Sequence, residues 1–269
     1  MRYRIEQVKI NPYDAAAQGG GISEKTLMRL LDEEVRRIAQ TAFRFQPIKN
    51  IEIIRESVDA RRKRNVSLVY TVDFDCDARL PFPEAVNKRY VCPKTEIIPG
   101  PRPVIAGFGP CGIFAALILA EAGLRPIVLE RGKPVDERYE DVQRFWETKD
   151  MPDPESNVQF GEGGAGTFSD GKLTTGIRDT RIRRVLEEFV RAGADPAILI
   201  KQKPHVGTDK LRGVIKNIRK HIESMGGEIR FSTRLDGLET EDGKLTALMT
   251  SNGRIETDWL ILAIGHSAR

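Results

Sequence analysis

Cysteine is scarce in this sequence of 269 residues, and its hydrophobic runs are short. Cys76, Cys92 and Cys111 are far apart, and none belongs to a C-x-x-C pair. This argues against a disulfide framework, a zinc ribbon and a redox dithiol. No apolar run reaches about 18 residues, so we expect no transmembrane helix. The N-terminus, MRYRIEQVKI, lacks the features of a secretory signal, and we expect a cytoplasmic protein.

Histidine is also scarce, and neither sign of charge dominates. The chain has three histidines, and no His or Cys cluster has the spacing of metal ligands, so we expect no metal site. The formal net charge is +4, and the excess lies within residues 1–98, which hold 18 Lys and Arg and 14 Asp and Glu. The most basic stretch, DARRKRN at 59–65, could contact nucleic acid. A solvent-exposed turn is the simpler interpretation, so we do not expect a nucleic-acid partner.

Residues 1–98 are predicted to form a small α+β domain with the order β-α-β-β. RYRIEQVKI alternates like a strand, and the next segment places leucines at helical spacing after Ser23, a suitable N-cap. IKNIEIIRESVDA and NVSLVYTVDFDC then flank the basic turn as two strands. The proline-rich stretch CPKTEIIPGPRP reads as a linker to a second domain, which we assign to residues 99–269.

The second domain is predicted to be α/β and Rossmann-like. Residues 104–130 read as strand, helix and strand, with the helix at Cys111–Ala122, and such a crossover implies a parallel sheet. Further helices are expected around 135–147, 180–194 and 209–225. EIRFSTRL then reads as a strand, and two turn signals, Asp242-Gly243 and Asn252-Gly253, indicate an antiparallel meander. The last segment, WLILAIG, is expected to be a buried strand ending at Gly265.

The glycine loop of residues 107–112 predicts a dinucleotide site. Gly107 permits the turn out of the strand, Gly109 leaves room for a pyrophosphate, and Gly112 lets the helix pack closely. The free N–H groups of the helix N-terminus then face the phosphates. Glu130 closes the second strand, where a carboxylate accepts from ribose hydroxyls and disfavours a 2′-phosphate, so NADP is the least favoured occupant. Our predicted contacts in this unit are Gly107, Gly109, Pro110, Cys111, Gly112, Glu130 and Arg131. Cys111 is expected to pack rather than to carry redox chemistry.

The later elements favour FAD over NAD. A long excursion, an antiparallel meander and an apolar strand ending in Ala-Ile-Gly follow the first unit. This order resembles the FAD domain of glutathione-reductase-type proteins, in which such a strand ends in Ala-Thr-Gly beside the flavin. Ile264 stands in place of the threonine, and Gly265 is a predicted cofactor contact.

A second glycine-rich segment, GEGGAGTFSDGKL at 161–173, carries a more specific resemblance. Together with HVGTDKL and AIGHSAR, it resembles a bacterial family of uncharacterised FAD-dependent dehydrogenases, across nearly the whole chain. The resemblance implies that this loop lines the isoalloxazine or the pyrophosphate. Its glycines allow close approach of backbone N–H groups. The residues expected to contact the cofactor are Gly163, Gly164, Gly166, Thr167, Ser169, Asp170 and Lys172.

The function expected from these patterns is that of an FAD-dependent oxidoreductase with an unknown substrate and electron acceptor. An NAD-dependent dehydrogenase using the same loop is one alternative. A non-catalytic binding protein that contacts RNA or protein through its N-terminal domain, including Arg61, Arg62, Lys63 and Arg64, is another. No second G-x-G-x-x-G and no returning Gly-Asp segment follow, so we expect a chain shortened at its C-terminus. Neither a catalytic acid or base nor an oligomeric state is predicted.

Overall fold

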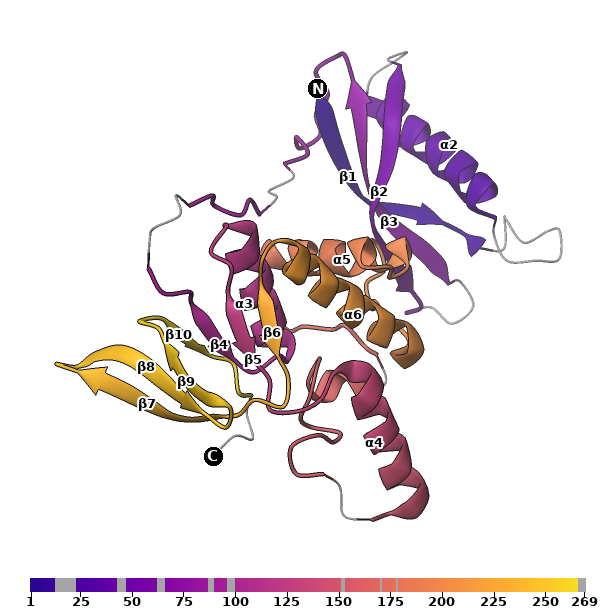
Figure 1. Ribbon diagram of the computed structural model, residues 1–269. Helices are drawn as coiled ribbons and strands as arrows, with labels where there is room; N and C mark the ends of the chain where they lie inside the picture. Colours follow the sequence, from indigo (N-terminus) through magenta and orange to yellow (C-terminus); the bar gives the residue numbers. More distant parts are fainter. Residues whose placement is uncertain are drawn as a thin grey trace. The chain divides into compact units, whose positions relative to one another are not determined.

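The computed structural model describes residues 1–12, 23–42, 47–61, 66–86, 90–95, 100–150, 153–169, 171–177 and 179–265. They form two compact units (Figure 1). The first contains Met1–Arg89 and Pro196–Pro204, and the second contains Tyr90–Asp195 and His205–Arg269. No helix within the described ranges is both long and apolar enough to cross a membrane.

The division differs from the sequence-based one, because the sequence assigns residues 196–204 to the second domain. In the structure this segment extends the edge of the first unit's sheet. The Glu56 N–H donates to Ile200 O at 2.7 Å, and the Gln202 N–H donates to Glu56 O at 3.0 Å. A pairing between segments so far apart in the chain leaves no local pattern in the sequence.

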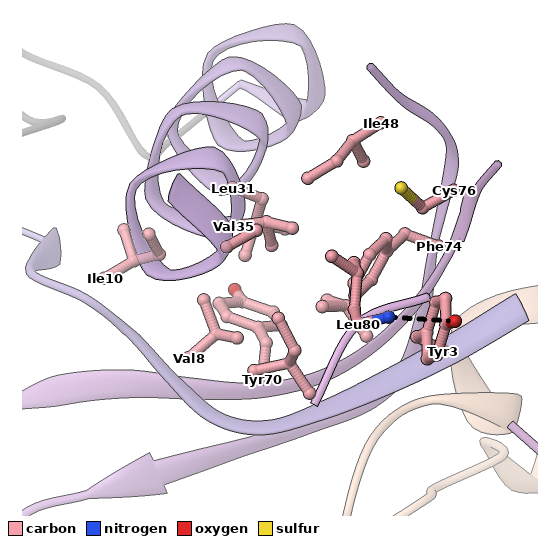
Figure 2. Packing of buried hydrophobic residues seen from close by; sticks show 13 residues of the cluster. Tyr3, Val8, Ile10, Leu31, Val35, Ile48, Tyr70, Phe74, Cys76 and Leu80 are labelled. Atoms are coloured by element: carbon pink, nitrogen blue, oxygen red, sulfur yellow. Dashed lines mark hydrogen bonds between the residues drawn. The ribbon is translucent and has the colours of Figure 1, made fainter. Parts of the chain in front are cut away.

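In its described residues, the first unit has a three-stranded antiparallel sheet and the long helix α2. β1 (Arg2–Ile10), α2 (Glu24–Ala42), β2 (Ile48–Asp59) and β3 (Ser67–Cys76) follow in that order, and the strands lie in the order β1-β3-β2. α2 begins after Ser23, whose Oγ accepts the Thr26 N–H at 3.2 Å, as expected of an N-cap. Hydrophobic side chains between α2 and the sheet form the core of this unit (Figure 2).

Tyr3 shows how this core accommodates a polar group. Its ring is buried at 2% exposure, and its hydroxyl accepts the Leu80 N–H at 3.1 Å. Figure 2 shows this hydrogen bond at the end of the cluster that includes Leu31 and Val35 of α2. The buried Tyr3 hydroxyl therefore keeps a hydrogen-bond partner, as buried tyrosines usually do.

The second unit contains a four-stranded parallel sheet in the order β10-β4-β5-β6. β4 (Val104–Ala106) leads through α3 (Pro110–Glu121) to β5 (Ile127–Leu129). The chain then forms α4 (Val135–Thr148), a 3-10 turn η1 (Ala165–Phe168) and α5 (Arg181–Arg191). After η2 (Pro196–Leu199), which belongs to the first unit, α6 (Thr208–Ser224) leads to β6 (Glu228–Arg230).

In the sequence, an antiparallel meander lies between β6 and β10. β7 (Leu235–Glu241), β8 (Lys244–Thr250) and β9 (Gly253–Glu256) form a separate three-stranded sheet, and β10 (Leu260–Leu262) returns beside β4 (Figure 1). Leu248 of β8 is fully buried in a cluster with Val104 and Ile127. The meander therefore packs against the parallel sheet and shares a core with it.

Two expectations about these strands need correction. The strand expected over EIRFSTRL is present but covers Glu228–Arg230, because the chain turns at Ser232, whose φ is +49°, and Leu235 already begins β7. The last strand is not fully buried, since Leu262 is 58% exposed and Ile264 is 46% exposed. β10 is at the edge of the sheet, and its carboxyl end lines a groove instead of entering the core.

Candidate functional site

A groove of about 770 Å³ lies at the carboxyl ends of the parallel strands in the second unit. Ala106 ends β4, Leu129 ends β5 and Leu262 ends β10, and all three line it. The chain proceeds from β4 to β5 on one side and places β10 on the other side of β4. In open α/β sheets, ligands bind at such a point, where the strand order reverses.

The first glycine loop forms the floor of this groove. A Cβ on Gly107, whose φ is +101°, would lie 2.4 Å from the carbonyl oxygen of Ala263. A Cβ on Gly112 would lie 1.9 Å from the carbonyl oxygen of Gly107. Both positions therefore require glycine, one to join β4 to the end of β10 and the other to bring α3 against the loop. The N-terminus of α3 is thus held at the groove, where its N–H groups and dipole favour an anion.

Glu130 follows β5 and holds two loops together. Its side chain is 4% exposed. Its Oε2 accepts the Phe108 N–H and its Oε1 accepts the Gly132 N–H, each at 2.8 Å. The carboxylate lines the groove and retains acceptor capacity toward it, because each carboxylate oxygen accepts two hydrogen bonds.

One end of the groove carries paired charges. The Arg131 guanidinium lies 4.5 Å from the centre of the Phe160 ring and pairs with Glu155. Arg234 contacts the same carboxylate at 3.0 Å, and these two arginines hold the pKa of Glu155 below its ordinary value. Arg131, Phe160 and Arg234 all line the groove, so this end combines an aromatic face with cationic groups.

The structure brings the second glycine loop against the first. The Gly163 N–H donates to Phe108 O at 2.9 Å. A Cβ on Gly164 would lie 3.3 Å from Gly109 Cα and 3.1 Å from Pro110 Cδ. The two loops therefore meet backbone to backbone, although 50 or so residues separate them in the sequence.

Arg138 of α4 fixes the shape of the second loop from behind. Its side chain is fully buried, and sequence analysis did not identify it. Its guanidinium donates to the backbone carbonyls of Asn157, Val158, Gly161, Glu162 and Gly164, at 2.7–3.3 Å. Burial lowers the pKa of Arg138 to about 10, against the opposing effect of Glu130 and Glu162, so the side chain stays charged at neutral pH.

Glu162 is a second buried group that the sequence analysis missed. It is fully buried, accepts the Val135 N–H at 2.7 Å and pairs with Arg219 at 3.1 Å. Burial raises its pKa, and this effect outweighs the hydrogen bond and the ion pair. One feature of the sequence points to Arg138. It shares a helix face with Val135 and Val142, and an apolar residue is expected on that face. Glu162 had no comparable signal.

The predicted contact residues divide between the groove and a neighbouring chamber. The groove is lined by Gly107, Gly109, Pro110, Cys111, Glu130, Arg131, Gly164 and Gly265. The chamber is lined by Pro110, Gly163, Gly166, Thr167, Ser169 and Lys172. Gly112 is buried beneath the groove, and Asp170 lies outside the described residues. Cys111 is exposed at the groove, so the expectation that its side chain packs is wrong.

The basic turn of the first unit is described only in part. Arg61 is exposed and donates to Asp59 at 2.9 and 2.7 Å, which holds the pKa of that carboxyl well below its usual range. Arg62, Lys63 and Arg64 lie outside the described residues. The described part of this turn therefore adds no support for a nucleic-acid interface.

Comparison with known proteins gives one clear relative without a described function. No family model matches the chain. An uncharacterized protein of Clostridium beijerinckii is 46% identical over 235 residues, which are 83% of this chain and 44% of the relative. This chain thus spans less than half the length of that relative.

Several solved structures are similar at a low level. An L-amino acid deaminase from Proteus myxofaciens, in complex with anthranilate, is 19% identical with a TM-score of 0.33, over 68% of this chain and 51% of that one. The THI4 protein of Thermovibrio ammonificans is 16% identical with a TM-score of 0.39, over 62% and 58%. Thioredoxin reductase from Lactococcus lactis is 15% identical with a TM-score of 0.36, over 63% and 37%. At these TM-scores, the similarity to solved structures carries no argument about function.

Proposed function

We propose that the second unit binds FAD and that the protein is a flavin-dependent oxidoreductase. The observation that carries the proposal is the groove at the carboxyl ends of β4, β5 and β10, which joins a glycine loop, a helix N-terminus and an acidic strand end. A dinucleotide requires these three features in this order. The meander between β6 and β10 favours a flavin dinucleotide, since a simple NAD domain more often continues with alternating strands and helices.

The residues present fit an extended dinucleotide. The groove floor is backbone at Gly109 and Gly164, and a Cβ on Gly164 would fill the space between the two loops. The exposed N-terminus of α3 suits the pyrophosphate. Glu130 is placed to accept from the ribose, and Arg131 with Phe160 offers a face on which adenine can stack.

The bound flavin would supply hydride and electron transfer. The chain contributes binding and orientation. Arg138 holds the second loop in shape and Glu130 fixes the first. The N-terminus of α3, which follows the first loop, would face the phosphates of the cofactor.

The absorption spectrum of the purified chain tests the proposal. We expect flavin bands near those of free FAD, either as isolated or after addition of FAD, and release of FAD on heating. Gly109→Val should remove this binding, because its branched side chain would occupy the path of the pyrophosphate. Gly213→Val is the matched control, since Gly213 is exposed on α6 and a Cβ there meets nothing within 4 Å.

Two results would contradict the proposal. One is a colourless protein that takes up no FAD while it binds NAD or ADP, which would favour the NAD alternative. The other is FAD uptake that is equal in wild type and in Gly109→Val, which would place the cofactor elsewhere.

A further inference from the structure

An apolar chamber of about 450 Å³ lies beside the groove within the second unit. Three helices form its walls, with Ile113 and Phe114 from α3, Val185 and Phe189 from α5, and Ile215 and Ile218 from α6. The second glycine loop closes one side. Its volume is in the range of small-molecule pockets.

The chamber is a pocket with a buried floor and a partly open mouth. Ile113, Ile215 and Ile218 are only 4%, 5% and 3% exposed, although each borders the chamber. Val185 and Phe189 on its wall are half-buried. The described residues of the second unit therefore form a concave apolar site that a small molecule can enter.

α5 presents its apolar stripe to the chamber. Ile182, Val185, Leu186 and Phe189 follow the i, i+3, i+4, i+7 spacing of one helix face, and all four line the space. Every residue of α5 is described, and Glu188 alone among them is buried. The apolar stripe thus borders a cavity where a surface helix usually borders packed core.

Polar contacts tie α5 to its two neighbouring helices. Arg184 pairs with Glu121 of α3, and within α5 it pairs with Glu188 at 2.8 Å. The Asn217 side chain of α6 donates to Ala192 O, just after α5, at 2.9 Å. α5 is therefore anchored to α3 and α6, while its apolar side chains border a space that would destabilise the protein if it stayed empty.

We propose that the chamber binds an apolar organic molecule. The three helical walls are apolar and exclude a highly charged ligand, because a charge against them would lose its hydration without a compensating partner. The polar side chains of the lining, Lys172 among them, come from the second glycine segment and the residues that follow it. Pro110 lines both the chamber and the groove, so the occupant would lie next to the cofactor. Its assignment as the substrate of the flavin rests on the proposed function, whereas its binding does not.

Fluorescence of N-phenyl-1-naphthylamine, a neutral apolar probe, tests this proposal on the full chain. We expect saturable binding to the wild type, with and without FAD. Val185→Trp would fill the chamber and should weaken probe binding about tenfold or more. Val190→Trp is the matched control on the same helix, because Val190 has similar exposure and does not line the chamber, and it should bind as the wild type does.

The outcomes separate this proposal from the proposed function. Probe binding that survives Gly109→Val, together with FAD binding that survives Val185→Trp, would support two distinct sites. Equal probe binding in Val185→Trp and wild type would overturn the chamber proposal. Competition between FAD and the probe would overturn it too, because the chamber would then belong to the cofactor. Circular dichroism and thermal unfolding of each variant identify any that fails to fold.

Discussion

At the scale of single residues, buried charges hold the two glycine loops in position. The Glu130 carboxylate and the Arg138 guanidinium bind backbone groups of the loops, and Glu162, itself in the second loop, accepts the Val135 N–H at the start of α4. Such groups are expensive to bury alone, and each is matched by hydrogen bonds or by an opposite charge. The loops carry many glycines and have little side-chain packing of their own, so these three residues set their conformation.

Glu130→Ala should lower the free energy of unfolding. The change would leave the Phe108 and Gly132 N–H groups without their acceptor, at about 1–3 kcal/mol for each buried donor. Urea unfolding measures the loss. Glu137→Ala, at an exposed position, should stay within about 0.5 kcal/mol of wild type. Equal effects of the two changes would show that Glu130 does not hold the loops.

Arg138→Lys should destabilise the protein although it keeps the charge. An ammonium group cannot reach five carbonyls, whereas the planar guanidinium does so. We expect a loss of about 2–4 kcal/mol in urea unfolding, together with weaker FAD binding. Arg144→Lys on the same helix serves as the control, because the side chain of Arg144 is 68% exposed. A small effect at Arg138 would mean that the second loop keeps its shape by other contacts.

Glu162 should make the stability depend on pH in a defined direction. Its pKa in the folded protein is raised by burial, so the folded state binds more protons than the unfolded state between the two pKa values. The contribution of Glu162 to stability is therefore full at low pH and falls as pH rises through the folded pKa. The stability of wild type relative to Glu162→Gln should be greater at pH 5 than at pH 7.5 in urea unfolding. A constant difference would show that Glu162 has an ordinary pKa.

At the scale of secondary structure elements, close approach of α3 to the first loop decides the geometry of the groove. Gly112 allows this approach, because a Cβ there would lie 1.9 Å from Gly107 O. Residues of α3 also border the chamber. The placement of this helix therefore affects both the groove and the chamber.

Gly112→Ala should shift α3 and lower stability by about 1–3 kcal/mol, as overpacking does. FAD binding should fall as well, because the helix N–H groups would move from the groove. Gly213→Ala on α6 provides a matched comparison, since no atom lies within 4 Å of a Cβ there and the change should be tolerated. Thermal unfolding and FAD titration of both variants would decide, and equal tolerance would contradict the role of Gly112.

At the scale of the whole molecule, the residues that line the groove all belong to the second unit. Ligand binding protects the backbone that it contacts from hydrogen exchange. FAD should therefore slow exchange at Phe108–Gly112 and at Gly161–Ala165 and leave β1, β2 and β3 unchanged. Mass spectrometry of exchange with and without FAD measures this. Equal protection of the first unit's strands would show that the cofactor contacts that unit.

Local patterns in the sequence predict the elements of the second unit and the first glycine loop. The helix at α6, the two hairpin turns and the strand–helix–strand opening all arise from spacing and turn chemistry, which act over a few residues. The second turn is shifted by one residue, since Gly253 already pairs with Thr250 in the meander.

Long-range contacts determine how the two glycine loops meet and which buried groups hold them. The Gly163 N–H bond to Phe108 O, the carbonyls around Arg138 and the pairing of Glu56 with residues 200 and 202 join segments far apart in the chain. The exposure of Leu262 and the apolar chamber also depend on neighbours that are distant in sequence. Periodicity reports which face of an element is apolar, but packing decides whether that face meets another side chain or a space.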